Sequence, residues 1–272
     1  MVVQHNLTAM NSNRMLGITT SSQAKATEKL SSGYKINRAA DDAAGLAISE
    51  KMRRQIRGLT QASANAQDGI SCVQTAEGAL NEVHDMLQRM NELAVKAANG
   101  TNQSEDDAYI QKEIKQLISE IDRVSTTSTF NERKLLNGSF SGITLQVGAE
   151  NSADNCITMN ISKMSASGLG VSTVSCSTQS KAKATIDAVK TAIKSLNEQR
   201  ADLGAVQNRL EHTIKNLDNV VENTTAAESQ IRDTDMASQM VTYSNNQILA
   251  QAGQAMLAQS NQANQGVLSL LQ

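Results

Sequence analysis

The chain contains no proline and very few aromatic side chains, and both absences narrow its fold class. Among its 272 residues, aromatics make up 2% and hydrophobic residues 39%, so any core consists of Ala, Leu, Ile, Val and Met. Without proline, the strongest interruption of a long helix is missing. Small aliphatic side chains also suit close helix packing better than a thick central core. We therefore expect a mainly α-helical protein.

The chain also has few cysteines, no long apolar run and little net charge. Three cysteines, Cys72, Cys156 and Cys176, are too few and too odd in number for a disulfide framework. The sequence contains no run of about 18 apolar residues, so it predicts no membrane span, and its first residues do not match a signal peptide. The net charge of −2 gives no general attraction to nucleic acid. Any export should therefore use a route without an ordinary signal peptide.

Residues that could carry catalysis are scattered. His5, His84 and His212 stand in no zinc-binding spacing, and no nucleophile or phosphate-loop motif occurs. Asp41 and Asp42 precede an Ala-rich segment, where a helix N-cap with first-turn charge is a better interpretation than a metal site. The sequence predicts no enzyme, no metal and no cofactor. A carboxylate pair in a helical bundle is the best enzyme alternative, and bound metal in a purified sample would support it.

The most regular feature is a seam of apolar residues at alternating steps of three and four, which forms one side of a helix. Two threes in a row around Val73 form a stammer. The helix would be roughly 70 Å long, so it needs other long helices beside it. The seam consists of Met52, Ile56, Leu59, Ser63, Ala66, Ile70, Val73, Ala76, Leu80, Val83, Leu87, Met90, Ala94 and Ala97.

Two further seams and a hairpin follow. Asn99 and Gly100 predict the end of the first helix, and Ser104, with a capping-box pattern, begins a second that carries a seam over 110–124. Apolar residues alternate with polar ones over 143–147 and again over 157–161, which predicts a β-hairpin. The Gly/Ser-rich run 165–180 predicts a loop, and the third helical seam starts at Ala184.

Both ends of the chain lack a self-sufficient apolar stripe. Residues 1–40 carry a thin one, and the tail 228–272 has no acidic or basic residue after Asp235. The N-terminal segment should be disordered until a partner covers it, and the uncharged tail should be buried against copies of itself or against a partner. We expect a long α-helical coiled-coil bundle with a small β-hairpin region and with paired N- and C-terminal helices.

Several segments resemble bacterial flagellin in a short form that lacks the variable outer region. They are EKLSSGYKIN (28–37), DDAAGLAI (41–48), GLTQAS (58–63), QRMNELA (88–94), EIDRVS (120–125), QILAQAG (247–253) and VLSLL (267–271). The resemblance covers almost the whole chain. It implies a structural subunit that polymerises into the extracellular flagellar filament for swimming motility, after type III export.

The resemblance also implies a domain plan and partners. Residues 1–43 and 228–272 would form a terminal filament-core domain that is disordered in the monomer. Residues 44–227 would form a rod-like bundle with the hairpin at about 140–178. Expected partners are copies of itself, the flagellin export chaperone, and the filament cap and hook-associated proteins; neither a nucleic acid nor a membrane is expected. The residues expected to serve polymerisation and chaperone binding are Val3, Leu7, Met10, Ile248, Met256, Val267, Leu268, Leu270 and Leu271.

One receptor site follows from the resemblance. In flagellins recognised by the Toll-like receptor of innate immunity, the recognition motif corresponds here to Gln88, Arg89, Leu93 and Glu113. Arg89 and Leu93 are four residues apart and should share a helix face beside the seam. These residues could equally serve contacts between subunits.

Two alternatives to a flagellin remain, a near one with the same plan of terminal helices and a more distant one from another class of protein. A hook–filament junction protein shares the plan of terminal helices but does not polymerise with itself. A coiled-coil signalling or adhesin module would have ordered termini and form a stable dimer in dilute solution. Growth on filament seeds distinguishes a flagellin from these two alternatives.

Overall fold

The computed structural model describes the backbone of residues 6–270 and the side chains of residues 6–263, and long helices dominate it. The helices are α1 (Leu7–Ser32), α2 (Ala43–Ala97), α3 (Ser104–Thr127), α4 (Gln179–Arg232) and α5 (Met236–Leu270). The short elements are β1 (Thr129–Phe130), β2 (Arg133–Lys134), β3 (Ile143–Gln146), the 3-10 turn η1 (Ala153–Asn155) and β4 (Cys156–Met159). The predicted mainly helical class, with a small β-hairpin region and paired end helices, is confirmed.

The chain forms two compact units. We call residues 1–54 with 223–272 the terminal unit, and residues 55–222 the central unit. The sequence instead placed its domain boundaries at 43/44 and 227/228. The assignment of residues 1–43 and 228–272 to the filament core, and of residues 44–227 to the rod, stays a prediction.

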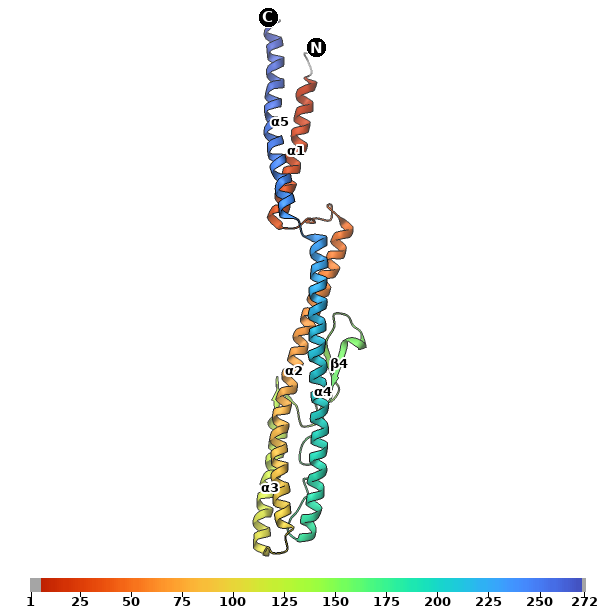
Figure 1. The fold of residues 1–272 in the computed structure, drawn as a ribbon, viewed down its shortest axis with the longest axis vertical. Helices are drawn as coiled ribbons and strands as arrows, with labels where there is room; N and C mark the ends of the chain where they lie inside the picture. The colour runs from red at the N-terminus through yellow and green to blue at the C-terminus, as the bar shows by residue number, and fades with distance from the viewer. Residues whose placement is uncertain (1–5, 271–272) are drawn as a thin grey trace. The chain divides into compact units, whose positions relative to one another are not determined.

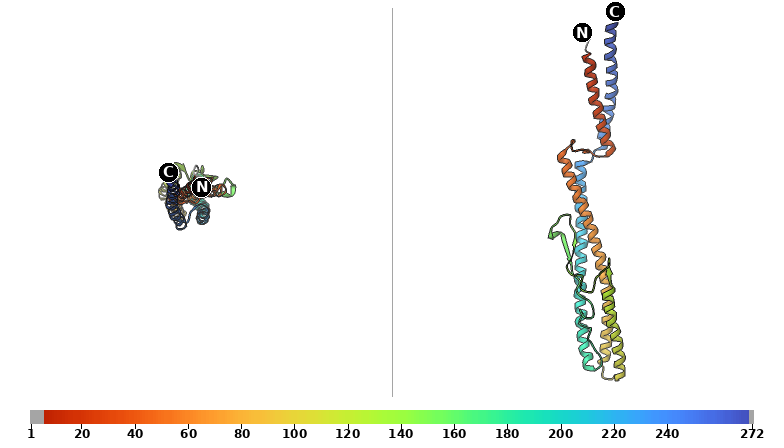
Figure 2. Two further views of the ribbon diagram at one scale, coloured as in Figure 1. Left: turned by 90° about the horizontal axis from the view of Figure 1, so that it is seen from above. Right: turned by 180° about the vertical axis from the view of Figure 1, so that it is seen from behind.

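In the central unit, α2, α3 and α4 run side by side, and both Figure 1 and the rear view in Figure 2 show it. The predicted seam of α2 is buried from Leu59 to Ala97 except at Ser63, where the neighbouring Ala62 is buried instead. Ser63 remains partly exposed, and its hydroxyl donates to Asp218 Oδ1 at 3.3 Å. Large side chains buried in the main core are Leu80, Leu87, Met90, Ile114, Ile121, Leu135, Leu136, Met159, Ile161, Leu196 and Leu203.

The helix starts follow the expected capping chemistry with two corrections. Asp42 caps α2, because its Oδ1 accepts from the Gly45 N–H at 2.9 Å. Asp41 does not cap the helix. It accepts from the backbone N–H groups of Arg38 and Asn37, and these hydrogen bonds lower the pKa of Asp41.

The second correction concerns α3. The capping box there uses Gln103 as the N-cap, and the Gln103 N–H donates to Asp106 Oδ2 at 3.3 Å. Ser104 is the first helical residue and not the cap.

The predicted hairpin is present as β3 and β4. The strands pair antiparallel, with Leu145 opposite Ile157. Two glycines allow the hairpin to lie directly on α2. A Cβ at Gly69 would be 2.5 Å from Leu145 Cδ1, and one at Gly58 would be 2.8 Å from the Cβ of Ala149 in the hairpin loop.

The sequence analysis missed a second, smaller hairpin. β1 pairs antiparallel with β2 around a two-residue turn, Asn131 and Glu132, in which both residues have positive φ (46° and 64°). Two-residue strands have too few positions for an alternating pattern to show.

The loop predicted at 165–180 is present but ends at residue 178, because α4 begins at Gln179, and it is anchored in the core. Ala166, Val171 and Cys176 are buried in the main core. The Ala166 N–H donates to Asp122 Oδ1 at 2.9 Å, and the Cys176 N–H donates to Gln111 Oε1 at 2.5 Å. Side chains of α3 therefore hold this segment in place.

In the terminal unit, α1 and α5 pack against each other along their length, as Figure 1 shows. α1 ends at Gly33, whose left-handed conformation (φ 76°) and N–H bond to the Lys29 carbonyl form a C-cap. The predicted tail 228–272 is not one element, because α4 continues to Arg232 and α5 begins at Met236. Asp235 caps α5 by accepting from the Ala237 N–H at 2.9 Å.

Candidate interaction surfaces

The terminal helices expose large apolar side chains. Of thirteen such side chains among the described residues, four lie on α1 and six on α5. The predicted polymerisation residues Leu7, Met10, Ile248 and Met256 are 62–67% exposed. Val267, Leu268 and Leu270 fall in α5 where side chains are outside the described residues, and Val3 and Leu271 lie outside the described residues altogether. The helix pair therefore carries many large apolar side chains that nothing in the described chain covers.

Little is buried between these two helices themselves. In the described side chains, Ala26 is the one buried residue of α1, and Ala250 is the one on α5. A groove of about 310 Å³ opens between the helices, lined by Asn11, Ser12, Met15, Leu16, Thr19, Leu249, Ala252, Gly253 and Met256. Two small buried side chains stabilise a helix pair weakly, because apolar burial scales with area. The pair needs further contacts to become a stable core.

The segments that connect these helices to α2 and α4 are held by a cluster around Tyr34. The guanidinium groups of Arg53 and Arg232 lie 5.4 Å and 4.8 Å from its ring centroid. Arg53 Nε also pairs with the buried Glu228 at 3.2 Å, and Arg232 pairs with Glu50 at 2.6 Å. Backbone bonds complete the cluster, because the Lys35 N–H donates to the Arg232 carbonyl at 2.6 Å.

The Arg53 guanidinium stays charged in this cluster. Burial alone would lower its pKa, but the hydrogen bond to Tyr34 and the carboxylate of Glu228 raise the pKa of Arg53 above its ordinary value. The cluster is thus an ion pair network in the place where both connecting segments meet the helices of the terminal unit, although the buried Arg232 Nε has no hydrogen-bond partner among the described residues.

A second surface contains most of the predicted receptor residues. Arg89 donates to Glu113 Oε1 at 2.9 Å and to Glu92 Oε2 at 3.1 Å, and these two hydrogen bonds raise the pKa of Arg89. All three side chains are about half exposed or more. They border a groove of about 570 Å³ that is also lined by Leu93, Lys96, Asn102, Asp106, Tyr109 and Ile110. The structure therefore brings Arg89 and Glu113 together on neighbouring helices.

Two of the predicted receptor residues lie differently from the expectation. Leu93 lines the groove with Arg89, as expected for residues on one helix face, but it is only 4% exposed and belongs to the core. Gln88 is exposed outside the groove, with its Nε2 2.9 Å from His84 Nε2. Tyr109, 66% exposed at the rim of the groove, is a contact candidate that sequence reasoning missed.

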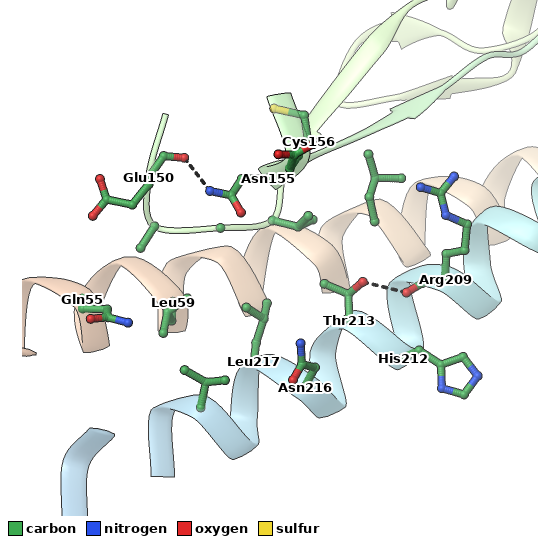
Figure 3. A pocket seen from close by; sticks show the side chains of 16 residues that line it. Gln55, Leu59, Glu150, Asn155, Cys156, Arg209, His212, Thr213, Asn216 and Leu217 are labelled. Atoms are coloured by element: carbon green, nitrogen blue, oxygen red, sulfur yellow. Dashed lines mark hydrogen bonds between the residues drawn. The ribbon is translucent and has the colours of Figure 1, made fainter. Parts of the chain in front are cut away.

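A third hollow, of about 770 Å³, lies where the hairpin loop crosses α2 and α4 in the central unit (Figure 3). Leu59 of α2 and Leu217 of α4 meet at its floor. Asn155 Nδ2 donates to the Glu150 carbonyl at 2.9 Å and fixes the loop above. The His212 side chain on α4 points away from Glu150 and Cys156, which lie on the other side of the hollow (Figure 3). The hollow is a packing groove of the hairpin.

The described part of the chain shows neither a metal-ion site nor a membrane-spanning helix. Over residues 6–263, no group of three His, Cys, Asp or Glu side chains is placed to hold a metal ion. None of the helices in residues 6–270 has the length and apolarity to cross a bilayer.

Comparison with known proteins identifies the family. Residues 3–141 match the bacterial flagellin N-terminal helical region, and residues 186–271 match the bacterial flagellin C-terminal helical region. The chain is 54% identical to a flagellin of Halalkalibacterium halodurans and 50% identical to the flagellar filament 31.3 kDa core protein of Treponema maltophilum, each over the full length of both chains. The crystal structure of Bacillus cereus flagellin is similar with a TM-score of 0.50 at 31% identity, over 57% of this chain and 88% of that chain. With both helical regions matched and identity at this level along its whole length, the chain belongs to the bacterial flagellin family.

Proposed function

We propose that this protein is a structural subunit that polymerises with itself into the bacterial flagellar filament. The observation that carries the proposal is the uncovered apolar face of α1 and α5, where most of the large exposed apolar side chains of the described chain gather. Water-exposed apolar area of this extent favours association. A relative that this chain matches over the full length of both is named a flagellar filament core protein, which agrees with this role.

The assembly would be open and head-to-tail, since such an interface gives a helical filament when its rotation does not close. In this proposal residues 1–43 and 228–272 become ordered at the filament centre, because neighbouring copies supply the apolar contacts that the free helix pair lacks. The subunit would act outside the cell, be held by the export chaperone beforehand, and meet the cap and hook-associated proteins at the filament ends. The role is structural and involves no catalysis.

Seeded growth tests the proposal. Purified protein is added to short filament fragments, and electron microscopy measures their length over time. We expect the fragments to elongate with added subunits, because each new copy buries apolar area of α1 and α5. A hook–filament junction protein would join the fragment ends without elongation, and that result would contradict the filament role.

We further propose that the surface around Arg89 binds the Toll-like receptor for flagellin. The residues assigned to the contact are Gln88, Arg89, Leu93 and Glu113. Arg89 and Glu113 are exposed, and they form an ion pair across α2 and α3 that presents both charges to a partner. Because Leu93 is buried, its contribution would be to support the surface from beneath.

Arg89→Ala should weaken binding to the receptor ectodomain by about tenfold, because an arginine at the centre of a contact commonly supplies much of the binding energy. Surface plasmon resonance with the free chain measures the change. Arg123→Ala is the matched control, since Arg123 also forms an exposed ion pair, with Glu120 on α3. Equal affinities for the Arg89 variant, a Glu113→Ala variant and the control would remove the site.

A further inference from the structure

The methionines of the described residues differ widely in exposure, with Met52 and Met86 partly exposed between the two extremes. Met10 and Met15 on α1 and Met236, Met240 and Met256 on α5 are 49–64% exposed. In the central unit, Met90, Met159 and Met164 are at most 4% exposed. The thioethers that solvent reaches most freely therefore lie on the two helices whose apolar faces are uncovered.

Two of the five exposed methionines share one groove. Met15 and Met256 both line the hollow between α1 and α5, next to Leu16 and Leu249. The groove carries no charged residue, and α5 has none along its whole length.

Oxidation would change the chemistry of this face. A peroxide transfers one oxygen atom to the methionine sulfur: the sulfur lone pair attacks that oxygen, the O–O bond breaks, and water leaves. The sulfur is oxidised by two electrons to a sulfoxide, and the peroxide oxygen is reduced. The side chain turns from flexible and apolar into polar and chiral. Two thiols reverse the step, forming a disulfide and water as the sulfoxide returns to the thioether.

We propose that Met10, Met15, Met236, Met240 and Met256 form a peroxide-sensitive modification site of the free subunit, whose oxidation blocks polymerisation. This inference rests on the proposed function, because it needs the faces of α1 and α5 to be buried between copies. A sulfoxide buried there without a hydrogen-bond donor carries the cost of any buried unsatisfied polar group. Once assembled, the same methionines are covered, so the free subunit is sensitive and the filament is protected.

The test begins with the location of the oxidation. The purified full-length chain is treated with dilute hydrogen peroxide, and peptide mass spectrometry follows the sulfoxide at each methionine. We expect the five methionines of α1 and α5 to react first and the three buried ones of the central unit last. In assembled filaments, the five should react much more slowly than in the free chain. Equal reaction rates at exposed and buried positions would overturn the proposal.

The second part measures assembly. The treated chain should show a critical concentration for seeded growth at least about tenfold above that of the untreated chain. Methionine sulfoxide reductase with a thiol should restore the untreated value. Cys156 is the one partly exposed thiol of the described chain, so the experiment is repeated with Cys156→Ser, and the peroxide effect should persist. Normal growth of the treated chain, or an effect lost with C156S, would overturn the inference.

A combined variant ties the effect to these side chains. With M10L, M15L, M236L, M240L and M256L together, the ratio of the treated to the untreated critical concentration should fall to about one, because leucine has no sulfur to oxidise. An unchanged ratio would overturn the proposal. If the variant does not grow, the reductase experiment on the peroxide-treated unmodified chain still tests the proposal. Failure of the untreated chain to elongate seeds would instead contradict the filament role itself. The two failures are thus separate results.

Discussion

The substitution Ile248→Asp should raise the critical concentration for seeded polymerisation by on the order of a thousandfold. Ile248 is 63% exposed on α5, so the free chain accommodates an aspartate in water. In the proposed filament the same position is covered by a neighbouring copy. No basic residue follows Arg232 in the sequence, so α5 itself offers no cation to pair with the carboxylate. An unpaired buried charge costs several kcal/mol even after relaxation, which is the origin of the large effect.

Light scattering at a series of subunit concentrations measures the critical concentration, and circular dichroism checks that the helix content is unchanged. Val95→Asp is the matched control, because Val95 is 54% exposed on α2 in the central unit. The control places the same charge on a similarly exposed apolar residue away from the terminal helices. We expect its critical concentration to change by less than about tenfold. Equal effects of the two substitutions would show that α5 has no special part in assembly.

The long helices could be predicted because their signal is local and repeated. Fourteen seam positions in α2 agree on one period, so single exceptions do not alter the prediction. The exception at Ser63 has a physical reason. Ala62 packs with Leu59 and Leu217, and a small side chain at that position allows α4 to approach closely. A heptad template cannot anticipate which of two adjacent small residues faces the partner.

Leu93 shows the limit of the same template. The seam assigns Leu87, Met90 and Ala94 to the buried side and leaves Leu93 beside them. In the structure, α2 is packed against both α3 and α4, and a helix with two neighbours buries a wider stripe than a two-helix seam. The number of neighbours depends on the whole fold and is not encoded in the period of one helix.

The anchored loop could not be predicted for a related reason. Its Gly/Ser composition signals a turn-rich segment, and that part is right. Its burial depends on two side chains of α3. Asp122 accepts from a backbone N–H group 44 residues later in the chain, and Gln111 accepts from one 65 residues later. The Arg89–Glu113 pair, 24 residues apart, could be placed only because the family resemblance linked the two helices. Contacts over such separations leave no trace in a local pattern.

The substitution Leu196→Ala should lower the free energy of unfolding of the free protein by about 3 kcal/mol. Leu196 lies on α4 and is fully buried in the main core, so the truncation removes apolar contacts and leaves a cavity. The side chains around it come from a tightly packed helical core that can relax only partly. We expect the midpoint of guanidinium denaturation, followed by circular dichroism, to fall while the slope stays the same.

Lys194→Ala on the same helix is the control. Lys194 is 78% exposed, and its ion pair with Glu198 at 3.8 Å lies in water. Exposed pairs of this kind contribute little, so this variant should stay within about 0.5 kcal/mol of the unmodified protein. Alanine also favours the helix at both positions, so the difference between the two variants reports burial and not helix propensity. Similar losses of unfolding free energy in the two variants would mean that the Leu196 side chain does not lie in the core. The three-helix packing of the central unit would then be wrong.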